Sequence, residues 1–388
     1  MIKNNFVWQI PYGVKDFLIG EAARKRALES GAAELFARWG YQEVVTPTFE
    51  YLETFDSSTL SEQAFKFFDR EGRALILRPD MTCPIARLVS ARMRDADGPR
   101  RLFYIANVFR YEQAQAGRQC EFYQAGVELL GAPCAAADAE IVALAVETLK
   151  NAGLDNFKIN MGHVDFLNGV VESASLDPRD GERIRSLLAG RDLAGLEAFA
   201  AERALPPALR ECLREAPLLH GGKEALEKAY RLAGNPTSAR ALDNLKNIFA
   251  MLESYGAAGA IDFDLGLIRD FGYYTGMVFE GYTPGLGFPI CGGGRYDNMM
   301  RFFGESCPAI GFSAGVDRLL IALGRRNAAV PSAPGAYVAW REGFFGRAVA
   351  AADNLRAQGR RAELAFCAQT ADEALESARG RDLVYIEK

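Results

Sequence analysis

Apolar residues at helical spacing mark three segments in the first part of the chain. They recur every three or four positions at 16–39, 82–93 and 138–152, and each of these ranges predicts a helix. Asp16 is expected to cap the first helix, because a carboxylate at this position accepts hydrogen bonds from the first backbone N–H groups. Gly40 and Gly153 follow the first and third helices and are expected to end them.

Between these helices, apolar and polar residues alternate as they do in strands. A short strand is predicted at 43–45, ending before Pro47. Residues 65–78 predict a hairpin that turns at Glu71–Gly72, and a second hairpin is predicted around 104–130. These segments indicate a domain built on a sheet.

The spacing changes to helical between 165 and 256, where Asp-Pro, Pro-Pro and Asn-Pro breaks separate the apolar runs. This range predicts a small helical domain inserted into the sheet-based one. Strands are expected again at 260–268 and 273–282, and a glycine-rich turn at 289–300. The segment GFSAGVDRLLIALG (311–324) predicts a strand that leads into a helix.

Residues 325–335 form the clearest linker, because they include the proline- and alanine-rich AAVPSAPG. Beyond them, strand-like and helical segments alternate over 336–388, which predicts a compact α/β unit. The expected organisation is a core of residues 1–324, with 165–256 inserted in it, followed by the linker and the small C-terminal domain.

Composition and cysteine usage are typical of a globular cytoplasmic protein. Of 388 residues, 49% are hydrophobic and 24% charged, and no apolar run approaches the roughly 20 residues of a membrane span. The N-terminus lacks the apolar core of a signal peptide. Seven cysteines, odd in number and never spaced as CxxC, argue against a disulfide framework or a zinc site. We therefore expect a cytoplasmic protein with no metal and no membrane partner.

The charge balance gives no general footprint for nucleic acid. The formal net charge is −5, whereas domains that bind a phosphate backbone are usually basic. The unit at 336–388 carries eight basic and eight acidic side chains and is electrically neutral. A nucleic-acid partner is therefore not expected.

The most informative chemistry lies at 104–128, YIANVFRYEQAQAGRQCEFYQAGVE. Arg110 and Arg118 bracket a polar loop, and a guanidinium group binds phosphate or carboxylate oxygens bidentately. Gln124 and Glu128 follow at alternating strand positions, and the hairpin brings both flanks onto one sheet face. The stretch predicts a pocket for an anion and a polar, nitrogen-bearing molecule. The alternative is a set of surface arginines that pair with nearby glutamates across the strands.

Two further segments supply polar groups that have a structural alternative. Arg318 opens the helix after a strand of small residues, where it can stack on a flat ring, meet a phosphate or form an ordinary salt bridge. Asp80 and Thr82, in LRPDMT, stand at a helix start. They serve there either as capping groups or as a binding site for the ammonium group of a ligand.

The segment GLIRDFGYYTGMVFEGY (266–282) adds Arg269 and the pair Tyr273 and Tyr274. Strand tyrosines are most often half-buried core residues whose hydroxyl finds a partner at the rim. Gly292–Gly294 form either a simple turn or a place where the backbone closely approaches a ligand.

In their order along the chain, these segments resemble the catalytic core of class II aminoacyl-tRNA synthetases, and histidyl-tRNA synthetase in particular. The resemblance covers residues 11–324 and implies an α+β fold with an antiparallel sheet flanked by helices. The helix and strand ending at Pro47 are similar to the first class motif, which lies at a dimer interface in that family. FRYEQ…GRQCEFYQ is similar to the second motif and GFSAGVDRL to the third, while YYTGMVFE and GGGRYD are similar to histidine-specific stretches.

The resemblance assigns the candidate residues to two sites. The histidine site comprises Asp80, Thr82, Gln124, Glu128, Arg269, Tyr273 and Tyr274. The nucleotide or anion site comprises Arg110, Arg118 and Arg318. Glu128 and Tyr274 flank the imidazole, because neutral imidazole offers one donor and one acceptor to a carboxylate and a phenol. Asp80, Thr82 and Gln124 address the α-amino group of histidine, and Arg269 its carboxylate.

The chain departs from active histidyl-tRNA synthetases at positions that matter for adenylate formation. Gly272 stands where the family carries an acidic residue, and Asp80 where it carries a glutamate. Asp317 replaces the glutamate of the third motif. Shortening or deleting a carboxylate weakens the contacts that position the reacting groups. The anticodon-binding domain of the family is also reduced here to a short neutral tail.

With these departures, the chain resembles the synthetase-like regulatory subunits of ATP phosphoribosyltransferase. That resemblance implies a non-catalytic protein with no cofactor, needed for the activity of a short-form catalytic subunit in the first step of histidine biosynthesis. It also implies feedback inhibition through bound L-histidine. The implied assembly is a hetero-octamer with the catalytic subunit, containing homodimers formed through the core.

Two alternatives stay open at this point. One is an active histidyl-tRNA synthetase with an abbreviated tail, for which the retained Arg110, Arg269 and Arg318 speak. The other is a class II ligase that charges an acceptor other than tRNA. Histidine-dependent exchange between ATP and pyrophosphate would identify the first, and adenylate formation without tRNA the second.

Overall fold

The structure is a computed structural model that describes residues 8–55, 59–94, 98–111, 119–173, 176–267, 274–304, 306–324 and 335–388. Its chain divides into two compact units, Met1–Ala328 and Ala329–Lys388. The predicted linker at 325–335 lies, apart from Gly335, outside the described residues.

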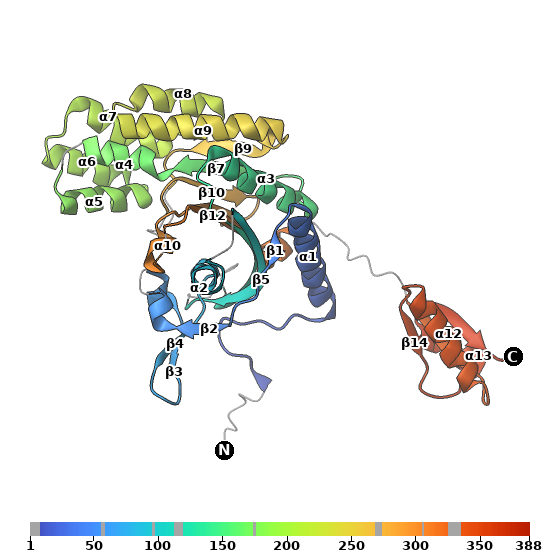
Figure 1. Ribbon diagram of the computed structural model, residues 1–388. Coiled ribbons are helices and arrows are strands. Elements are labelled where there is room, and N and C mark those ends of the chain that lie inside the picture. The colour runs from blue at the N-terminus through green and yellow to red at the C-terminus, as the bar shows by residue number, and fades with distance from the viewer. Residues whose placement is uncertain are drawn as a thin grey trace, which may run out of the picture. The chain divides into compact units, whose positions relative to one another are not determined.

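A nine-stranded sheet forms the centre of the first unit (Figure 1). Its strands follow the order β1 (Gln42–Glu43), β5 (Arg100–Phe109), β6 (Glu121–Leu130), β12 (Ala309–Gly315), β11 (Cys291–Arg295), β10 (Met277–Tyr282), β7 (Lys158–His163), β9 (Ile261–Asp264) and β8 (His220–Gly221). From β5 to β7 in this order, neighbouring strands pair antiparallel. At the two ends, β1 pairs parallel with β5 and β9 parallel with β7, and β8 pairs antiparallel with β9. Segments from four distant parts of the sequence therefore meet in one sheet.

Three long helices cover one face of this sheet: α1 (Ile19–Arg38), α3 (Ala135–Asn151) and α9 (Pro236–Ser254). The odd-numbered residues of β6, such as Val127 and Leu129, are buried in the core with them. Because side chains alternate along a strand, the even-numbered residues Gln124 and Glu128 lie on the opposite face. The alternation that predicted β6 thus also decides which of its residues line a site.

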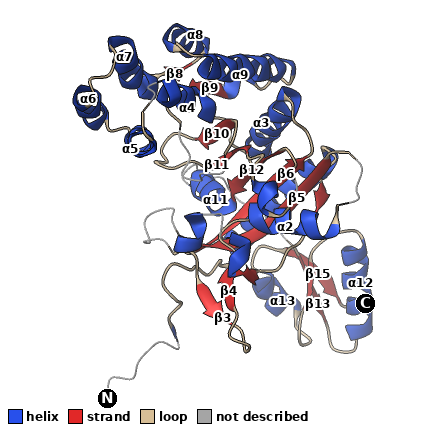
Figure 2. Cartoon of the chain, turned by 60° about the vertical axis from the view of Figure 1, so that its left-hand side comes forward, coloured by secondary structure: helices blue, strands red, loops and turns tan. Residues whose placement is uncertain are grey.

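The opposite face carries α2 (Thr82–Arg92), which lies in front of β5 and β6 in Figure 2. A second core joins α2 residues such as Ile85 to Leu102 and Leu130 of these strands. Beside α2 lie a small sheet and short helices: β2 (Phe49–Tyr51), β4 (Ala74–Leu77), β3 (Lys66–Phe68), the 3-10 helices Leu52–Phe55 and Thr59–Gln63, and α10 (Met299–Phe302). The helix α11 (Val316–Gly324) follows β12 directly.

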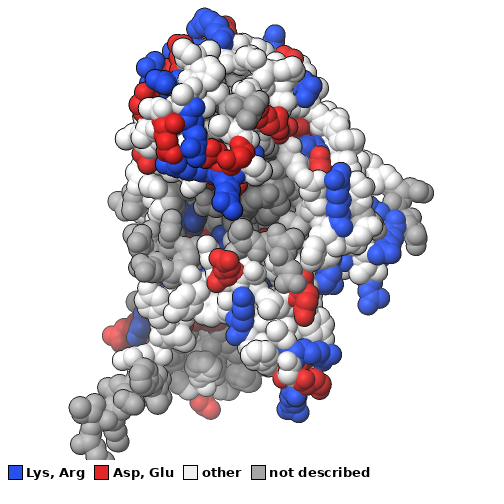
Figure 3. All heavy atoms as spheres, turned by 90° about the vertical axis from the view of Figure 1, so that its left-hand side faces the viewer, with Lys and Arg blue, Asp and Glu red and all other residues white. Residues whose placement is uncertain are grey.

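Between β7 and β9 the described chain is mainly helical, and we call residues 164–254 the helical segment. Its elements are α4 (Val164–Ser173), α5 (Pro178–Ala189), α6 (Leu193–Glu202), α7 (Pro207–Glu215), the 3-10 helix Ala216–Leu218, β8, α8 (Lys223–Leu232) and α9. Prolines at the first helical positions of α5, α7 and α9 account for the sharp helix starts that the sequence indicated. Basic and acidic side chains alternate in the upper part of Figure 3, where this segment lies.

The second unit is a three-stranded parallel sheet with a helix after each of its first two strands. Its elements are β13 (Ala336–Trp340), α12 (Phe345–Ala357), β14 (Ala362–Leu364), α13 (Ala371–Ala378) and β15 (Asp382–Ile386). Val338, Trp340 and several alanines of the helices form its core. Strand and helix alternate here, as the spacing predicted.

Two local predictions were wrong. The first helix begins at Ile19, and Asp16 does not cap it, because the extended Leu18 occupies the N-cap position. The predicted strand at 43–45 is present, displaced by one or two residues, as β1 at Gln42–Glu43. Gly292–Gly294 do not form a turn but lie within β11. A Cβ on Gly293 would come within 2.2 Å of the Gly311 carbonyl, so strand packing explains this glycine.

The α+β fold class is confirmed, because a largely antiparallel sheet is flanked by helices. The helix at 82–93, the helix at 138–152 and both hairpins are also present, within a few residues of their predicted ends. No helix in the described ranges combines the length and apolarity needed to cross a bilayer.

Candidate functional site

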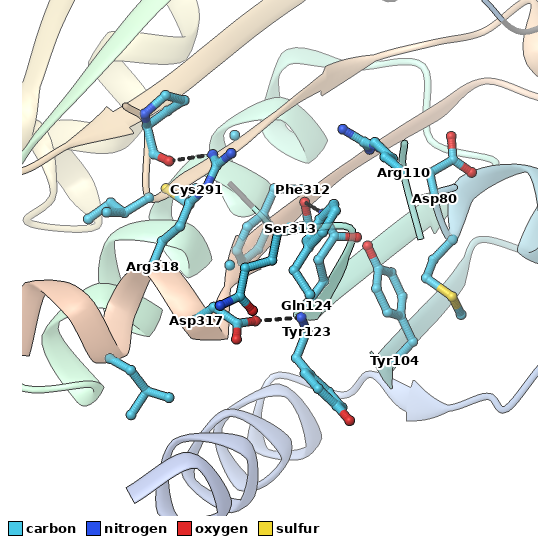
Figure 4. A pocket seen from close by; sticks show the side chains of 18 of the residues that line it. Asp80, Tyr104, Arg110, Tyr123, Gln124, Cys291, Phe312, Ser313, Asp317 and Arg318 are labelled. Atoms are coloured by element: carbon cyan, nitrogen blue, oxygen red, sulfur yellow. Dashed lines mark hydrogen bonds between the residues drawn. The ribbon is translucent and has the colours of Figure 1, made fainter. Parts of the chain in front are cut away.

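A pocket of about 730 Å³ opens on the sheet face that carries α2. The described members of both predicted sites all line it: Asp80, Thr82, Gln124, Glu128, Tyr274, Arg110 and Arg318. Figure 4 shows four of them around the pocket: Asp80 from before α2, Arg110 from the end of β5, Gln124 from β6 and Arg318 from α11. Arg118, Arg269 and Tyr273 lie outside the described residues. Residues separated by more than 200 positions thus form one site.

Glu128 is the most completely buried acid of this pocket, with 3% of its surface exposed. Thr82 Oγ1 donates a hydrogen bond to Glu128 Oε1 at 3.0 Å, and the Tyr296 hydroxyl donates one to Oε2. On the neighbouring strand, a Cβ on Gly311 would lie 1.9 Å from Glu128 Oε2, so only glycine leaves room for the carboxylate. The carboxylate is therefore held in one orientation by two hydroxyls and a glycine.

Burial raises the pKa of Glu128 from 4.5 to about 8. Hydrogen bonds from Tyr296 and Thr82 oppose this rise, and the nearby Asp80 carboxylate adds to it. The folded-state pKa lies above the ordinary value, so the neutral carboxyl predominates at pH 7 in the unliganded pocket. A bound group that donates a hydrogen bond or carries positive charge would favour the ionised form.

Asp80 is the second buried acid of the pocket and stands two residues before Thr82, the first residue of α2. Its Oδ1 accepts a hydrogen bond from the Cys83 backbone N–H at 3.3 Å, but the N-cap position is held by Met81, and Thr82 bonds to Glu128 and does not cap the helix. Asp80 Oδ2 is buried and, among the described residues, has no hydrogen-bond partner. Burial raises the pKa of Asp80, while Arg110, which lies beside it in Figure 4, lowers it. A buried acceptor without a partner favours a ligand that donates to it.

Gln124 lies near the start of β6 and bonds to β12. Its Nε2 donates to Ser313 Oγ at 3.3 Å, across the β6–β12 pairing in which Gly126 lies opposite Ser313. Tyr104 reaches the same place from β5, because it pairs with Gly126, and a Cβ on that glycine would lie 2.5 Å from the Tyr104 ring. Amide, hydroxyl and phenol groups thus line the floor beside the acids.

The two described arginines enter the pocket from different sides (Figure 4). Arg110 follows β5, where its Nε donates to the Pro79 carbonyl at 2.9 Å and its guanidinium lies 5.4 Å from the Phe122 ring centre. Arg318 lies in the first turn of α11, and its Nη1 donates to the Pro289 carbonyl at 2.7 Å. Neither of these contacts is a salt bridge. Both arginines bring positive charge to the wall of the pocket.

Asp317 and an N-terminal segment complete this part of the wall. Asp317 Oδ2 accepts a hydrogen bond from the Tyr123 backbone N–H at 2.6 Å, so it ties α11 to β6. Gly13, with a φ of 75°, accepts from the Cys120 N–H at 2.6 Å and brings residues 13–17 to the pocket rim. A Cβ on Gly13 would lie 2.3 Å from Cys120 Sγ, so glycine is required at this contact.

Sequence reasoning did not assign Tyr104, Tyr296 and Ser313 to the site, although all three line the pocket. For Tyr104 a signal exists: in the predicted hairpin it lies opposite Gly126 and therefore on the face of Gln124 and Glu128. Tyr296 lies in the quoted stretch GGGRYD, but its approach to Glu128 depends on the strand order. No metal-binding group of three acids, histidines or cysteines exists within the described ranges.

The arrangement suits an amino acid with a polar side chain. Two buried acids offer acceptors for ammonium and N–H groups, and the arginines offer donors to an anion. Amide and hydroxyl groups between them distinguish ring positions by hydrogen bonding. The pocket therefore has the groups needed to bind a small zwitterion in a single orientation.

Sequence comparisons identify known proteins that are similar to this chain. A family model described as histidyl-tRNA synthetase matches residues 13–319. The ATP phosphoribosyltransferase regulatory subunit of Moorella thermoacetica is 45% identical over 392 aligned residues, which cover 99% of both chains. The regulatory subunit of Desulforamulus reducens is 45% identical over 351 residues, 89% of this chain and 87% of that one. The similarity thus extends over both compact units.

Solved structures share the same fold. A crystal structure described as an ATP phosphoribosyltransferase regulatory subunit/histidyl-tRNA synthetase from Bacillus halodurans has a TM-score of 0.89 and 34% identity, with 99% of both chains covered. The histidyl-tRNA synthetase of a Nostoc species has a TM-score of 0.82 at 19% identity, over 96% of this chain and 89% of that one. The second likeness concerns the fold alone. Together they confirm the predicted class II synthetase-like architecture.

Proposed function

The chain belongs to the family of ATP phosphoribosyltransferase regulatory subunits, which share the histidyl-tRNA synthetase fold, and we propose that it senses L-histidine for that enzyme. In this proposal it activates a short-form catalytic subunit in the first step of histidine biosynthesis. Bound histidine then inhibits the assembly. The chain itself catalyses no step and needs no cofactor.

The observation that carries this proposal is the pair of buried acids in one pocket. Asp80 Oδ2 has no partner among the described residues and suits the α-ammonium group of histidine. Glu128, oriented by Thr82 and Tyr296, suits an imidazole N–H. Gln124 and Tyr274 line the same pocket and complete the polar contacts that histidine requires. Arg269 and Tyr273 remain proposed contacts of the ligand.

Regulation follows if the pocket is bound more tightly in one state of the complex than in the other. A ligand shifts such an equilibrium only by its differential affinity, commonly about 1–3 kcal/mol or roughly 5- to 150-fold in activity. We propose a hetero-octamer with the catalytic subunit, in which this chain forms homodimers through its first unit. Exposed aromatic side chains of the small sheet, such as Phe49 and Tyr51, are available for such contacts.

The test is a mixing experiment with purified subunits. Turnover of ATP and phosphoribosyl pyrophosphate by a short-form catalytic subunit is measured with and without this chain, and with increasing L-histidine. We expect activity to appear on mixing and to fall as histidine is added. Unchanged activity on mixing would refute the regulatory role, and activity insensitive to histidine would refute the sensing role.

An active histidyl-tRNA synthetase remains a second candidate, favoured by Arg110 and Arg318, which both line the pocket. That activity would require adenylate formation, so it predicts histidine-dependent exchange of pyrophosphate into ATP. We expect no exchange above background with this chain. Exchange that disappears in Arg318→Ala would assign the chain to the synthetases by activity.

A further inference from the structure

We propose that Arg295, which lies outside the pocket, is a positioning residue that holds Tyr296 against Glu128 and thereby tunes the site to imidazole. This inference rests on the proposed histidine site. Arg295 ends β11, one residue before Tyr296. Its side chain points to the other face of the sheet, where α3 packs.

The guanidinium of Arg295 is fixed by α3 and by the chain that precedes α3. Its side chain is 10% exposed, and that of its partner Asp138 on α3 is 3% exposed. Arg295 Nε and Nη2 donate to Asp138 Oδ1 at 2.9 and 2.5 Å, and Nη2 also donates to the Ala132 carbonyl at 3.1 Å. A fork held at three points inside a protein leaves the adjoining backbone little freedom.

A second set of contacts runs from Arg295 to the residue on the other side of Tyr296. Arg295 Nη1 donates to Asp297 Oδ1 at 3.1 Å, and that oxygen also accepts from the Ala309 N–H of β12 at 2.9 Å. Tyr296 is therefore clamped between two residues that bond to each other. Its own N–H donates to the Ala309 carbonyl at 2.8 Å, which aligns it with β12.

The same cluster holds the backbone beside Tyr274. Thr275 N–H donates to the Arg295 carbonyl at 2.7 Å, and Thr275 Oγ1 accepts from the Asp297 N–H at 2.9 Å. A Cβ on Gly276 would lie 3.0 Å from Arg295 Cδ, so this segment rests directly on the arginine. The backbone beside Tyr274 and the backbone on both sides of Tyr296 are thus joined through Arg295 and Asp297.

The consequence at the pocket is the orientation and charge of Glu128. Tyr296 is 3% exposed and donates to Glu128 Oε2 while Thr82 donates to Oε1, so a ligand can use only the remaining acceptor capacity of the carboxylate. The bond from Tyr296 also lowers the pKa of Glu128 against the effect of burial. If Tyr296 moves, the Glu128 carboxyl loses the hydrogen bond that orients it. Because this bond also stabilises the ionised form, the pKa of Glu128 would rise further. Among the described residues, Asp80, Cys83 and Tyr104 are the other buried titratable groups that interact with Glu128 from the residues before α2, from α2 and from β5, and we expect them to keep their positions.

The test uses the full chain with Arg295→Met combined with Asp138→Leu. Replacing both members of a buried ion pair by apolar side chains of similar size is often tolerated, whereas removing one leaves an unpaired buried charge. Arg295→Lys is the conservative companion, since it keeps the charge but not the fork. Calorimetry gives Kd for L-histidine and for L-2-thienylalanine, whose ring has a similar size but no N–H donor.

We expect the double variant to remain folded by circular dichroism and to bind histidine about tenfold more weakly at pH 7. Thienylalanine affinity should change less than about twofold, because it makes no N–H contact with Glu128. The pH at which histidine affinity rises should move upward by about one unit in the double variant. For Arg295→Lys, the histidine affinity and this pH should lie between those of the wild type and the double variant.

Two results would overturn the positioning role. One is a folded double variant with unchanged histidine affinity and pH profile. The other is an equal loss for both ligands, which would show general loosening and no tuning to imidazole. If the double variant does not fold, Arg295→Lys alone tests the positioning role. The quantity is again the loss of histidine affinity relative to the loss of thienylalanine affinity. A wild-type chain that binds no histidine would instead refute the proposed function.

Discussion

At the scale of single residues, the pocket depends on how Glu128 is held. Its position on β6 places Glu128 on the sheet face that carries the pocket, and strand alternation is enough to predict that it shares this face with Gln124. Its environment does not follow from alternation: the Tyr296 hydroxyl comes from 168 positions away, and the room for the carboxylate comes from Gly311. The resemblance of its motif proposed this acid as a site residue, and its raised pKa is a property of the folded protein.

The raised pKa of Glu128 predicts a pH-dependent histidine affinity. The neutral carboxyl predominates below about pH 8, and the ionised form is the better acceptor for an imidazole N–H, so affinity should rise with pH. We expect an increase approaching about tenfold between pH 6.5 and 7.5. Calorimetry on the wild type and Glu128→Gln checks this, since glutamine removes the titration of this residue and keeps an acceptor.

The ligand also titrates in this range, so the ratio of wild-type to Glu128→Gln affinity is the quantity to follow. A ratio that is constant with pH would show that Glu128 does not change charge on binding. In that case the pocket would bind histidine without the proposed contact to its ring.

At the scale of elements, sequence patterns predicted strands and helices well where a local signal exists. Gly72, with a φ of 79°, makes the turn of the first hairpin, as its position indicated. The glycines of β11 misled, because they resemble a turn and serve instead as close contacts between strands. Where a neighbouring strand leaves no room for a side chain, the sequence around the glycine does not show this. The requirement becomes visible only when the strands are paired in the sheet.

The junction between β7 and α4 carries the buried His163, which predicts destabilisation by acid. Burial lowers its pKa from 6.5 to about 4, Asp165 opposes this change and Arg295 adds to it. The folded protein therefore binds this proton less readily than the unfolded chain. The contribution of neutral His163 to stability is present above pH 6.5 and is lost as the pH falls toward 4, by about 3 kcal/mol in all.

Urea unfolding of the wild type and His163→Asn at pH 7 and pH 4.5 tests this prediction. Other acids titrate in both proteins, so the difference between the two isolates the histidine. We expect the wild type to lose stability relative to the variant at the lower pH. Equal losses in both proteins would contradict a buried, neutral histidine at this junction.

At the scale of the whole molecule, the described pocket belongs to one of the two compact units. Every described residue that lines the pocket belongs to the first unit. The second unit has its own core and a neutral charge balance. The sequence predicts a boundary here through the linker at 325–335 and through the alternation of strand and helix beyond it.

Removal of residues 329–388 should therefore leave histidine binding intact. We expect Kd for histidine to change less than about twofold in a chain ending at residue 328, because no pocket contact is lost. Calorimetry on the truncated and full chains gives the comparison, with Glu128→Ala in both as the control that abolishes the site. Loss of binding on truncation would show that the second unit contributes to the pocket.

By itself, the sequence indicated most helices, the hairpins and the α+β class, because these follow from spacing along the chain, which is a local property. Seven of the described pocket residues were proposed from the resemblance of their motifs to a known family, not from spacing alone. Only the tertiary structure decided that Tyr296 and Thr82 orient Glu128, and that Asp138 and Arg295, 157 positions apart, lie behind them. The physical reason is the strand order of the sheet. It brings distant segments within hydrogen-bond distance, and contacts of that range leave no periodic trace in either segment.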